Sequence, residues 1–173
     1  EGFDLEAAPT RLQALIMFIR VLGEEEQALA WSGTTPFKDI EKGSQAEHYV
    51  GYAYEKGYTN GYTATSFKPA GAVNAYQYTE FVLRAMGYSS AANKDLSDTL
   101  LRAVNAGVLT DGDAAMLQSA AFLRAQLVYI SYYALEADLP DGSQSLADRL
   151  MDLGVFTRDE WRGSWKLVKS DRL

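Results

Sequence analysis

One helical pattern occurs three times in this 173-residue chain, and it constrains the possible folds more than any other feature. Residues 10–23 (TRLQALIMFIRVLG) align without gaps with residues 74–87 (NAYQYTEFVLRAMG), and a third copy, LRAQLVYISYYALE, occupies residues 123–136. Apolar residues in this pattern recur three or four positions apart, which is the spacing of one helix face. The copies therefore predict helices over 10–22, 74–87 and 123–136.

The first two copies begin with a recognisable hydrogen-bonding signal. Thr10 is followed by Gln13, and Asn74 is followed by Gln77 at the same distance. Such a pair forms a capping box, in which each side chain accepts a hydrogen bond from the other residue's backbone N–H at the helix start. A glycine closes both copies and is a natural helix stop. The sequence thus predicts both ends of these two helices.

A second amphipathic unit also occurs three times, over residues 46–56, 96–106 and 145–153, and a glycine follows each copy directly. The connection in the middle of the chain, residues 57–73, contains an Asn-Gly turn signal, and we expect the apolar side chain of Phe67 to plug the loop. The repeating unit is therefore a helix, a glycine, a loop and a capped helix.

The order of the units predicts how the chain closes. It starts with a second helix and ends with a first one, so we expect an all-α, pseudo-threefold array in which residues 145–156 complete the lobe begun by helix 10–22. Residues 1–173 are expected to form a single module. Its repeat parts are 8–23 (a second half), 36–88 (complete), 95–137 (degenerate) and 145–161 (a first half).

The composition excludes several classes of protein. The chain has 16 Lys and Arg against 23 Asp and Glu, which gives a net charge of −7. Because contacts with phosphate groups need clustered cations, a nucleic-acid partner is excluded. It has no cysteine, which rules out disulfides and thiolate metal sites. No apolar run approaches the ~20 residues of a membrane-spanning helix. A single histidine, His48, forms no metal cluster, so we expect neither a metal nor another cofactor.

The motifs of the middle repeat resemble the S-layer homology (SLH) family, whose repeat runs F-x-D, a helix, G-[IVL]-[IV]-x-G-Y, F-x-P and then I-T-R-A-E. The matching residues are Phe37-Lys38-Asp39, Gly57-Tyr58-Thr59-Asn60-Gly61-Tyr62 and Phe67-Lys68-Pro69. The T-R-A-E element is resembled by Thr10-Arg11-Leu12-Gln13 and by Leu123-Arg124-Ala125-Gln126. The middle repeat departs from the family because Ala75 stands where the arginine belongs, and the third repeat has lost its G-Y turn and F-x-P.

The resemblance implies a spindle of three helical prongs around a central three-helix bundle. It also implies non-covalent binding of secondary cell-wall polysaccharide, often bearing a pyruvate ketal, in grooves between repeats, with the T-R-A-E arginine prominent among the contacts. On that basis Arg11 and Arg124 would each hold a carboxylate, assisted by free N–H groups of the helix start. The alternative is that each arginine is solvent-exposed or paired with a nearby acid.

Three further residues complete the expected glycan site. Asp39 would contact sugar hydroxyls, and the alternative is that it caps a helix or interacts with the helix dipole. The Gly61–Tyr62 turn would form the groove wall. The Tyr62 ring either faces a sugar or simply packs in the turn. No catalytic residue and no metal ligand is assigned.

Other charged segments receive structural interpretations. Residues 111–113 (Asp-Gly-Asp) are expected to form a turn, and residues 24–26 (Glu-Glu-Glu) a solvated acidic run after the helix stop. Arg20 and Arg84 lie late in their helices, where a cation interacts favourably with the helix dipole. We do not expect either arginine to bind a ligand.

The sequence therefore favours a non-catalytic anchoring module, outside the cell and in the wall of a Gram-positive bacterium, with cell-wall polysaccharide as its partner. No signal peptide is visible, and the chain opens just before a helix pattern, as expected for a piece of a longer exported protein with other domains. The alternative is a structural or protein–protein interaction domain that keeps the SLH fold and has lost glycan binding. An enzyme is the least favoured class, because no nucleophile elbow, Ser-His-Asp arrangement or phosphate loop is recognisable.

Overall fold

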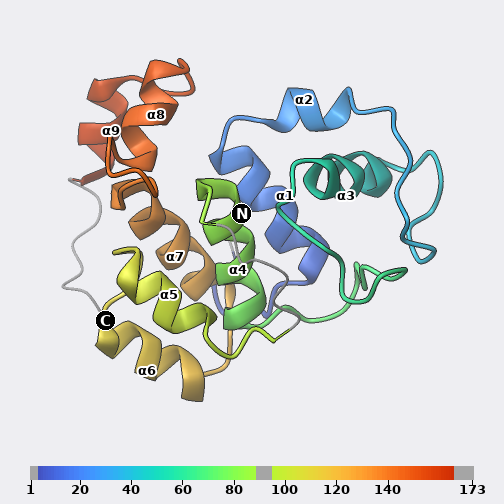
Figure 1. The fold of residues 1–173 in the computed structure, drawn as a ribbon, viewed down its shortest axis with the longest axis horizontal. Coiled ribbons are helices and arrows are strands. Elements are labelled where there is room, and N and C mark those ends of the chain that lie inside the picture. Colours follow the sequence, from blue (N-terminus) through green and yellow to red (C-terminus); the bar gives the residue numbers. More distant parts are fainter. Residues whose placement is uncertain (1–3, 89–94, 166–173) are drawn as a thin grey trace.

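The computed structural model describes residues 4–88 and 95–165, and within these ranges the chain forms nine α-helices and no β-strand (Figure 1). The helices are α1 (Arg11–Val21), α2 (Glu25–Leu29), α3 (Gln45–Glu55), α4 (Ala75–Met86), α5 (Thr99–Asn105), α6 (Asp111–Ser119), α7 (Arg124–Glu136), α8 (Leu146–Asp152) and α9 (Arg158–Trp165). The all-α prediction is confirmed. Six of the helices lie where the two repeated units predict them, although α5 begins at Thr99 and not at residue 96.

The capping boxes form as the sequence predicts. The Thr10 hydroxyl accepts from the Gln13 backbone N–H at 3.2 Å, and the Gln13 side chain accepts from the Thr10 N–H at 3.1 Å. Asn74 and Gln77 repeat this arrangement at the start of α4. Gly23, with a φ of +70°, follows α1 in the left-handed conformation that glycine adopts without strain. These local interactions fix the ends of two bundle helices independently of the rest of the fold.

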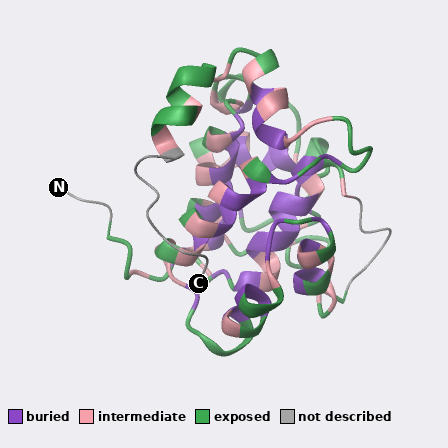
Figure 2. Cartoon of the chain, turned by 90° about the vertical axis from the view of Figure 1, so that its left-hand side faces the viewer, coloured by how far each residue is buried: buried purple, intermediate pink, exposed green. Residues whose placement is uncertain are grey.

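Helices α1, α4 and α7 form the centre of the molecule, since each of them packs against the other two. Phe18 of α1 meets Tyr78 of α4 edge-to-face, with ring centroids 6.1 Å apart. The Tyr78 hydroxyl is fully buried and satisfied by Ser131 of α7 at 2.5 Å. A buried hydroxyl without a partner would destabilise the fold, so this pair is part of what specifies the packing of the three helices. Burial is greatest along these central helices and decreases toward the outer ones (Figure 2).

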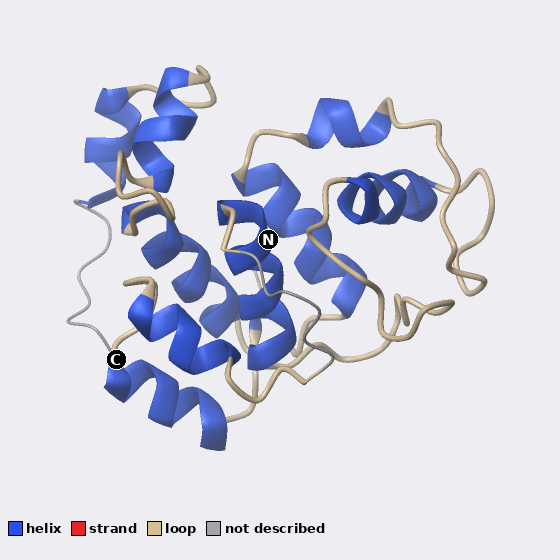
Figure 3. Ribbon diagram, in the orientation of Figure 1, coloured by secondary structure: helices blue, strands red, loops and turns tan. Residues whose placement is uncertain are grey.

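Shorter helices pack on the outside of the central three. Helix α3 lies against α1 and α2, α5 against α4 and α6, and α8 against α7. Gly23, after α1, lies so close to Val155 that a Cβ built on it would be 2.6 Å from that side chain. The segment after α8 therefore reaches the end of α1, although about 130 residues separate them in sequence. Two long connections, residues 30–44 and 56–74, leave the helices on the α3 side (Figure 3).

One predicted turn is wrong. Residues 111–113 open helix α6, because Thr110 and Asp113 form a further capping box: the Thr110 hydroxyl accepts from the Asp113 N–H at 3.1 Å, and the Asp113 carboxylate accepts from the Thr110 N–H at 2.7 Å. Asp113 also accepts from the Tyr129 hydroxyl at 2.8 Å. The glycine between the two aspartates suggested a turn, but it lies in the first turn of a helix that the cap nucleates.

The prediction of a solvated acidic run after α1 is wrong for Glu24 and Glu25, whereas Glu26 is exposed as predicted. Glu24 accepts hydrogen bonds from the hydroxyls of Tyr52 (3.1 Å) and Tyr58 (2.9 Å), and Glu25 pairs with Arg20 at 2.7 Å. The run opens α2 and links it to buried tyrosines, one in α3 (Tyr52) and one just after that helix (Tyr58). The helix-dipole role expected for Arg20 is therefore accompanied by an ion pair.

Candidate ligand-binding pocket

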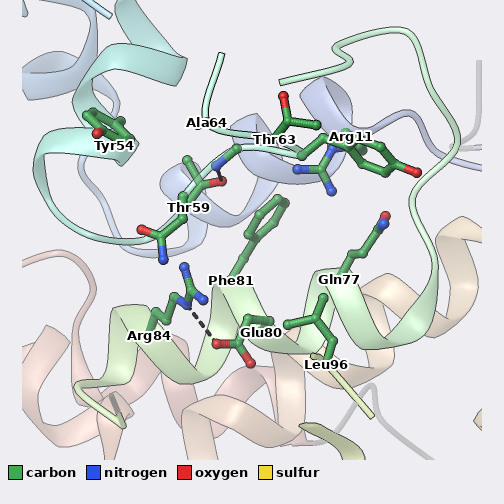
Figure 4. A pocket seen from close by; sticks show the side chains of 13 residues that line it. Arg11, Tyr54, Thr59, Thr63, Ala64, Gln77, Glu80, Phe81, Arg84 and Leu96 are labelled. Atoms are coloured by element: carbon green, nitrogen blue, oxygen red, sulfur yellow. Dashed lines mark hydrogen bonds and ion pairs between the residues drawn. The ribbon is translucent and has the colours of Figure 1, made fainter. Parts of the chain in front are cut away.

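A cavity of about 900 Å³ opens between three parts of the chain: the start of α1, the loop of residues 59–64 and one face of α4 (Figure 4). Its volume falls in the range of small-molecule binding pockets. Tyr54 of α3 and Leu96, before α5, border it. The pocket is therefore lined by residues of the 36–88 segment together with Arg11 before it and Leu96 after it.

The floor of the pocket is a single helical stripe. Gln77, Glu80, Phe81 and Arg84 all line it, and their spacing of three and four residues places them on one face of α4. In the view of Figure 4 the Phe81 ring lies between the guanidinium groups of Arg11 and Arg84. Sequence reasoning missed this stripe, because Gln77 was explained by its capping box and Arg84 by the helix dipole. The i, i+3, i+4, i+7 spacing of polar residues around Phe81 was the available signal.

Arg11 is the most unusual residue of the pocket. It is charged but only 3% exposed, and its Nε donates to the Phe67 carbonyl at 2.8 Å. Its guanidinium carbon lies 4.9 Å from the Phe67 ring centroid and 5.4 Å from that of Phe81. Burial lowers the pKa of Arg11 to about 10, although Tyr62 and Asp39 oppose that shift, so the side chain stays protonated at neutral pH. Among the described residues no carboxylate forms an ion pair with it.

The backbone N–H groups beside the two arginines are not free for a ligand, contrary to the expectation from sequence. The N–H of Arg11 donates to the Gly71 carbonyl at 2.9 Å, and that of Arg124 donates to the Ala7 carbonyl at 3.0 Å. Other chain segments thus cap the starts of α1 and α7. Any anion at these arginines has to be bound by the side chains.

Gly61 and Tyr62 both line the pocket. Gly61 has a φ of +83°, and a Cβ there would lie 2.3 Å from the Phe37 ring, so no other residue fits without movement. Tyr62 is 50% exposed, and its ring centroid lies 3.6 Å from the Lys68 ammonium and 5.8 Å from the Arg11 guanidinium carbon. These two cations already contact the ring, which favours the packed interpretation of Tyr62 over a free stacking platform.

Asp39 does not line the pocket but organises the loop behind it. Its carboxylate accepts from the Ser66 hydroxyl (2.7 Å) and from the backbone N–H groups of Phe67 (2.9 Å) and Lys68 (2.7 Å). Burial acts to raise the pKa of Asp39, but these hydrogen bonds outweigh it and leave the pKa below its usual value. Lys68 has a φ of 58°, a strained conformation that the Asp39 contact helps to hold. Asp39 thereby positions the Phe67 carbonyl that holds Arg11.

Arg124 lies at a second, separate location. It is half-buried at the start of α7, and its Nη2 is 3.5 Å from the Gln13 side-chain oxygen of α1. It does not line the pocket that contains Arg11. The structure therefore does not bring the five predicted site residues together: three line one pocket, Asp39 supports that pocket, and Arg124 faces another helix.

Glu80 is the acidic residue of the pocket. It is 3% exposed, and its Oε1 accepts from Arg84 at 2.7 Å. Its Oε2 accepts from the Thr99 hydroxyl at 3.1 Å and from Arg102 of α5. A buried carboxylate is stable only when it is paired and hydrogen-bonded, and here two arginines compensate one charge.

Comparison with known proteins finds one family and one relative. Residues 36–74 match the S-layer homology domain, a non-catalytic anchoring module, and the matched segment contains the pocket wall and its supporting loop. The chain thus contains one S-layer homology domain. It is also 29% identical over 170 residues to a cell surface protein of Thermoanaerobacter kivui; the match covers 92% of this chain and 21% of that protein, so the chain spans about a fifth of its relative. No solved structure matches the chain significantly.

Residues 4–88 and 95–165 contain neither a membrane-spanning helix nor a metal cluster. None of the helices there has the length and apolar character needed to cross a bilayer. No three His, Asp or Glu side chains in the same ranges gather closely enough to hold a metal ion.

Proposed function

We propose that this chain is a cell-surface anchoring module that binds secondary cell-wall polysaccharide non-covalently, with the pocket at Arg11 as its main binding groove. The observation that carries the proposal is the Arg11 guanidinium: it is buried in the wall of an open cavity, held by a backbone carbonyl, with no described carboxylate paired to it. Burying an uncompensated cation is unfavourable unless an anion completes the site. A carboxylate-bearing glycan, such as a pyruvylated one, supplies that anion.

The charge distribution supports an acidic ligand. The chain as a whole carries a net charge of −7, so it repels anions at long range. The pocket lining is different, because Arg11 and Arg84 outnumber the single carboxylate of Glu80. A local cationic excess favours a bidentate arginine–carboxylate contact. Phe81 and Tyr54 provide apolar surface beside it for a sugar ring.

The pseudo-threefold arrangement of three repeats is part of this proposal. The hydrogen bonds at two helix starts support it, because they have the same register. Arg11 donates to Gly71, four residues before α4, and Arg124 donates to Ala7, four residues before α1. Under this arrangement the Arg124–Gln13 contact marks a second groove equivalent to the first.

The proposal places the chain outside the cell, at the cell wall, as one part of a longer surface protein. The S-layer homology match and the relative's description as a cell surface protein support this location. The other domains of such a protein would project from the wall while this module holds the polysaccharide.

A second candidate is a structural or protein–protein interaction domain that keeps the fold without binding glycan. The observation in its favour is Ala75, which takes the place of the arginine at the start of α4 and is 3% exposed. A groove at that position would have no arginine at its mouth. This candidate predicts that no groove of the chain binds wall polymer.

Co-sedimentation with cell-wall sacculi, before and after removal of the secondary polymer, tests the proposal. The intact chain should sediment only with unstripped walls, and Arg11→Ala should weaken binding by about 1–3 kcal/mol, the range for a charge-assisted hydrogen bond. Arg11→Lys keeps the charge and should lose less. Arg158→Ala, at an exposed position of α9, is the matched control and should bind normally.

The two candidates give opposite results. Sedimentation that is unchanged in both Arg11→Ala and Arg124→Ala, with normal melting temperatures, rejects the assigned site. Absence of wall binding together with recovery of a specific surface protein in a pull-down supports the structural candidate instead.

A further inference from the structure

Arg84 is the second cation of the pocket, and sequence reasoning gave it no ligand role. It lies one helical turn beyond Phe81 on the α4 stripe, and only 10% of its side chain is exposed. In Figure 4 its guanidinium lies on the opposite side of the Phe81 ring from Arg11. The pocket therefore has a cation on each side of one apolar ring.

Glu80 has partners besides Arg84. Arg84 donates to Oε1 of Glu80 at 2.7 Å, whereas Oε2 of the same carboxylate accepts from Thr99 and Arg102. If Arg84 turned toward a ligand anion, Glu80 would still have a cation and a hydroxyl as partners. The usual penalty for leaving a buried carboxylate uncompensated would thus be avoided.

Arg102 comes from α5 and does not line the pocket. It also pairs with Asp98 at 3.3 Å, which holds its guanidinium next to Glu80. Asp98 and Thr99, which do not line the cavity, therefore help to hold Arg102 in place when a ligand enters. Arg102 therefore neutralises Glu80 whether Arg84 pairs with Glu80 or with a ligand anion.

We propose that Arg84 is a second acid-binding group, so that the pocket selects saccharides that carry two anionic groups over those that carry one. This inference rests on the proposed function, since it specifies the ligand of the same pocket. Arg11 would hold one acidic group, the second would exchange with Glu80 on Arg84, and the sugar would lie across Phe81. A cavity of about 900 Å³ accommodates a ligand of disaccharide size.

Calorimetric titration with two synthetic disaccharides tests this inference. The two share one backbone, and one carries a pyruvate ketal on a single sugar while the other carries a ketal on both. The wild-type chain should bind the doubly acidic sugar about tenfold more tightly, the gain typical of one added charge-assisted hydrogen bond. Arg84→Gln should remove this preference, so that the two sugars bind with nearly equal affinity.

Glu80→Gln provides the reverse test. It removes the carboxylate that competes with the ligand for Arg84, so the preference for the doubly acidic sugar should increase. A purely structural role of the pair predicts instead that both variants weaken both ligands alike. Arg158→Gln is the matched control, and melting temperatures show that each variant is folded.

The outcomes separate this inference from the proposed function. Equal affinity of the wild-type chain for the two sugars, or a preference that survives Arg84→Gln, overturns the role of Arg84 and leaves wall binding intact. Failure of both sugars to bind at millimolar concentration overturns the proposed function and this inference together.

Discussion

The role of Asp39 provides the sharpest test of how the loop behind the pocket is held. Asp39→Asn keeps the shape of the side chain and removes its charge. In the wild-type chain the Ser66 hydroxyl and the Lys68 N–H both donate to one carboxylate oxygen, and the Phe67 N–H donates to the other. If the amide oxygen of the variant still accepts from Phe67, its NH₂ group faces the other two donors. The Ser66 hydroxyl can rotate and accept, but the backbone N–H of Lys68 cannot, so one donor is left without its partner.

The magnitude follows from those three hydrogen bonds. Hydrogen bonds to a charged group contribute about 1.5–3 kcal/mol each, but Asp39 is exposed and water replaces part of that energy. Because the substitution breaks one of the hydrogen bonds and weakens the other two, we expect a destabilisation of about 2 kcal/mol. For a chain of this length, that lowers the melting temperature by about 4–8 °C.

The effect should depend on pH in a defined direction. Because the pKa of Asp39 is lower in the folded chain than in the unfolded one, the carboxylate stabilises the fold above the unfolded pKa of about 4. That contribution disappears as the pH falls through the lowered folded pKa. The stability difference between the wild-type chain and Asp39→Asn should therefore be full at pH 7 and should shrink below about pH 4.

Urea unfolding at pH 7 and at pH 3, followed by circular dichroism, measures both effects. Glu41→Gln is the matched control, since Glu41 is a nearby exposed acid and its substitution should change stability by less than about 0.5 kcal/mol. Equal stability of Asp39→Asn and the wild-type chain at pH 7, or a difference that stays the same at pH 3, would refute this account of the loop.

Three further predictions concern stability. A Cβ at Gly51 would lie 2.1 Å from the Trp31 ring, so Gly51→Ala should displace that ring and destabilise the fold by about 1–3 kcal/mol in urea unfolding. Thr110→Ala removes the cap of α6 and should lower the free energy of unfolding by about 1 kcal/mol, measured in the same way. Burial, and to a lesser extent the nearby Glu24 carboxylate, raises the pKa of Tyr58, and burial raises the pKa of Tyr132 to about 12. Stability should therefore be full below about pH 10, where the tyrosines of the unfolded chain begin to ionise, and should fall above that pH. Urea midpoints and tyrosinate absorbance at pH 9 and pH 11 test the last prediction.

The matched control for Gly51→Ala is Gly163→Ala. Gly163 is exposed on α9 and has open space around its Cβ position, so this substitution should be neutral or stabilising. Ser119→Ala, at the far end of α6, should leave stability nearly unchanged. An equal destabilisation in Thr110→Ala and Ser119→Ala would argue against the capping explanation, and an identical urea midpoint at both pH values would argue against raised tyrosine pKa values.

Most helices could be located from the sequence, because their signals act over short distances. A capping box joins residues three positions apart, as in Thr10 and Gln13, and forms as soon as the first turn does. The same rule would have located α6, since Thr110 and Asp113 form such a pair. It was missed because aspartate replaces the usual glutamate or glutamine and a glycine lies between them.

Helix periodicity and capping depend only on nearby residues, so they were enough to predict an all-α chain with two repeated helical units and an arginine at the start of two bundle helices. What those arginines contact depends on how distant segments pack together. Arg11 meets Phe67 across 56 positions, whereas Arg124 meets Gln13 across 111, and local sequence does not encode either distance. The packing of α1, α4 and α7 brings these segments together, and it places Arg11 in a pocket, Asp39 in the loop that supports the pocket and Arg84 in the pocket floor.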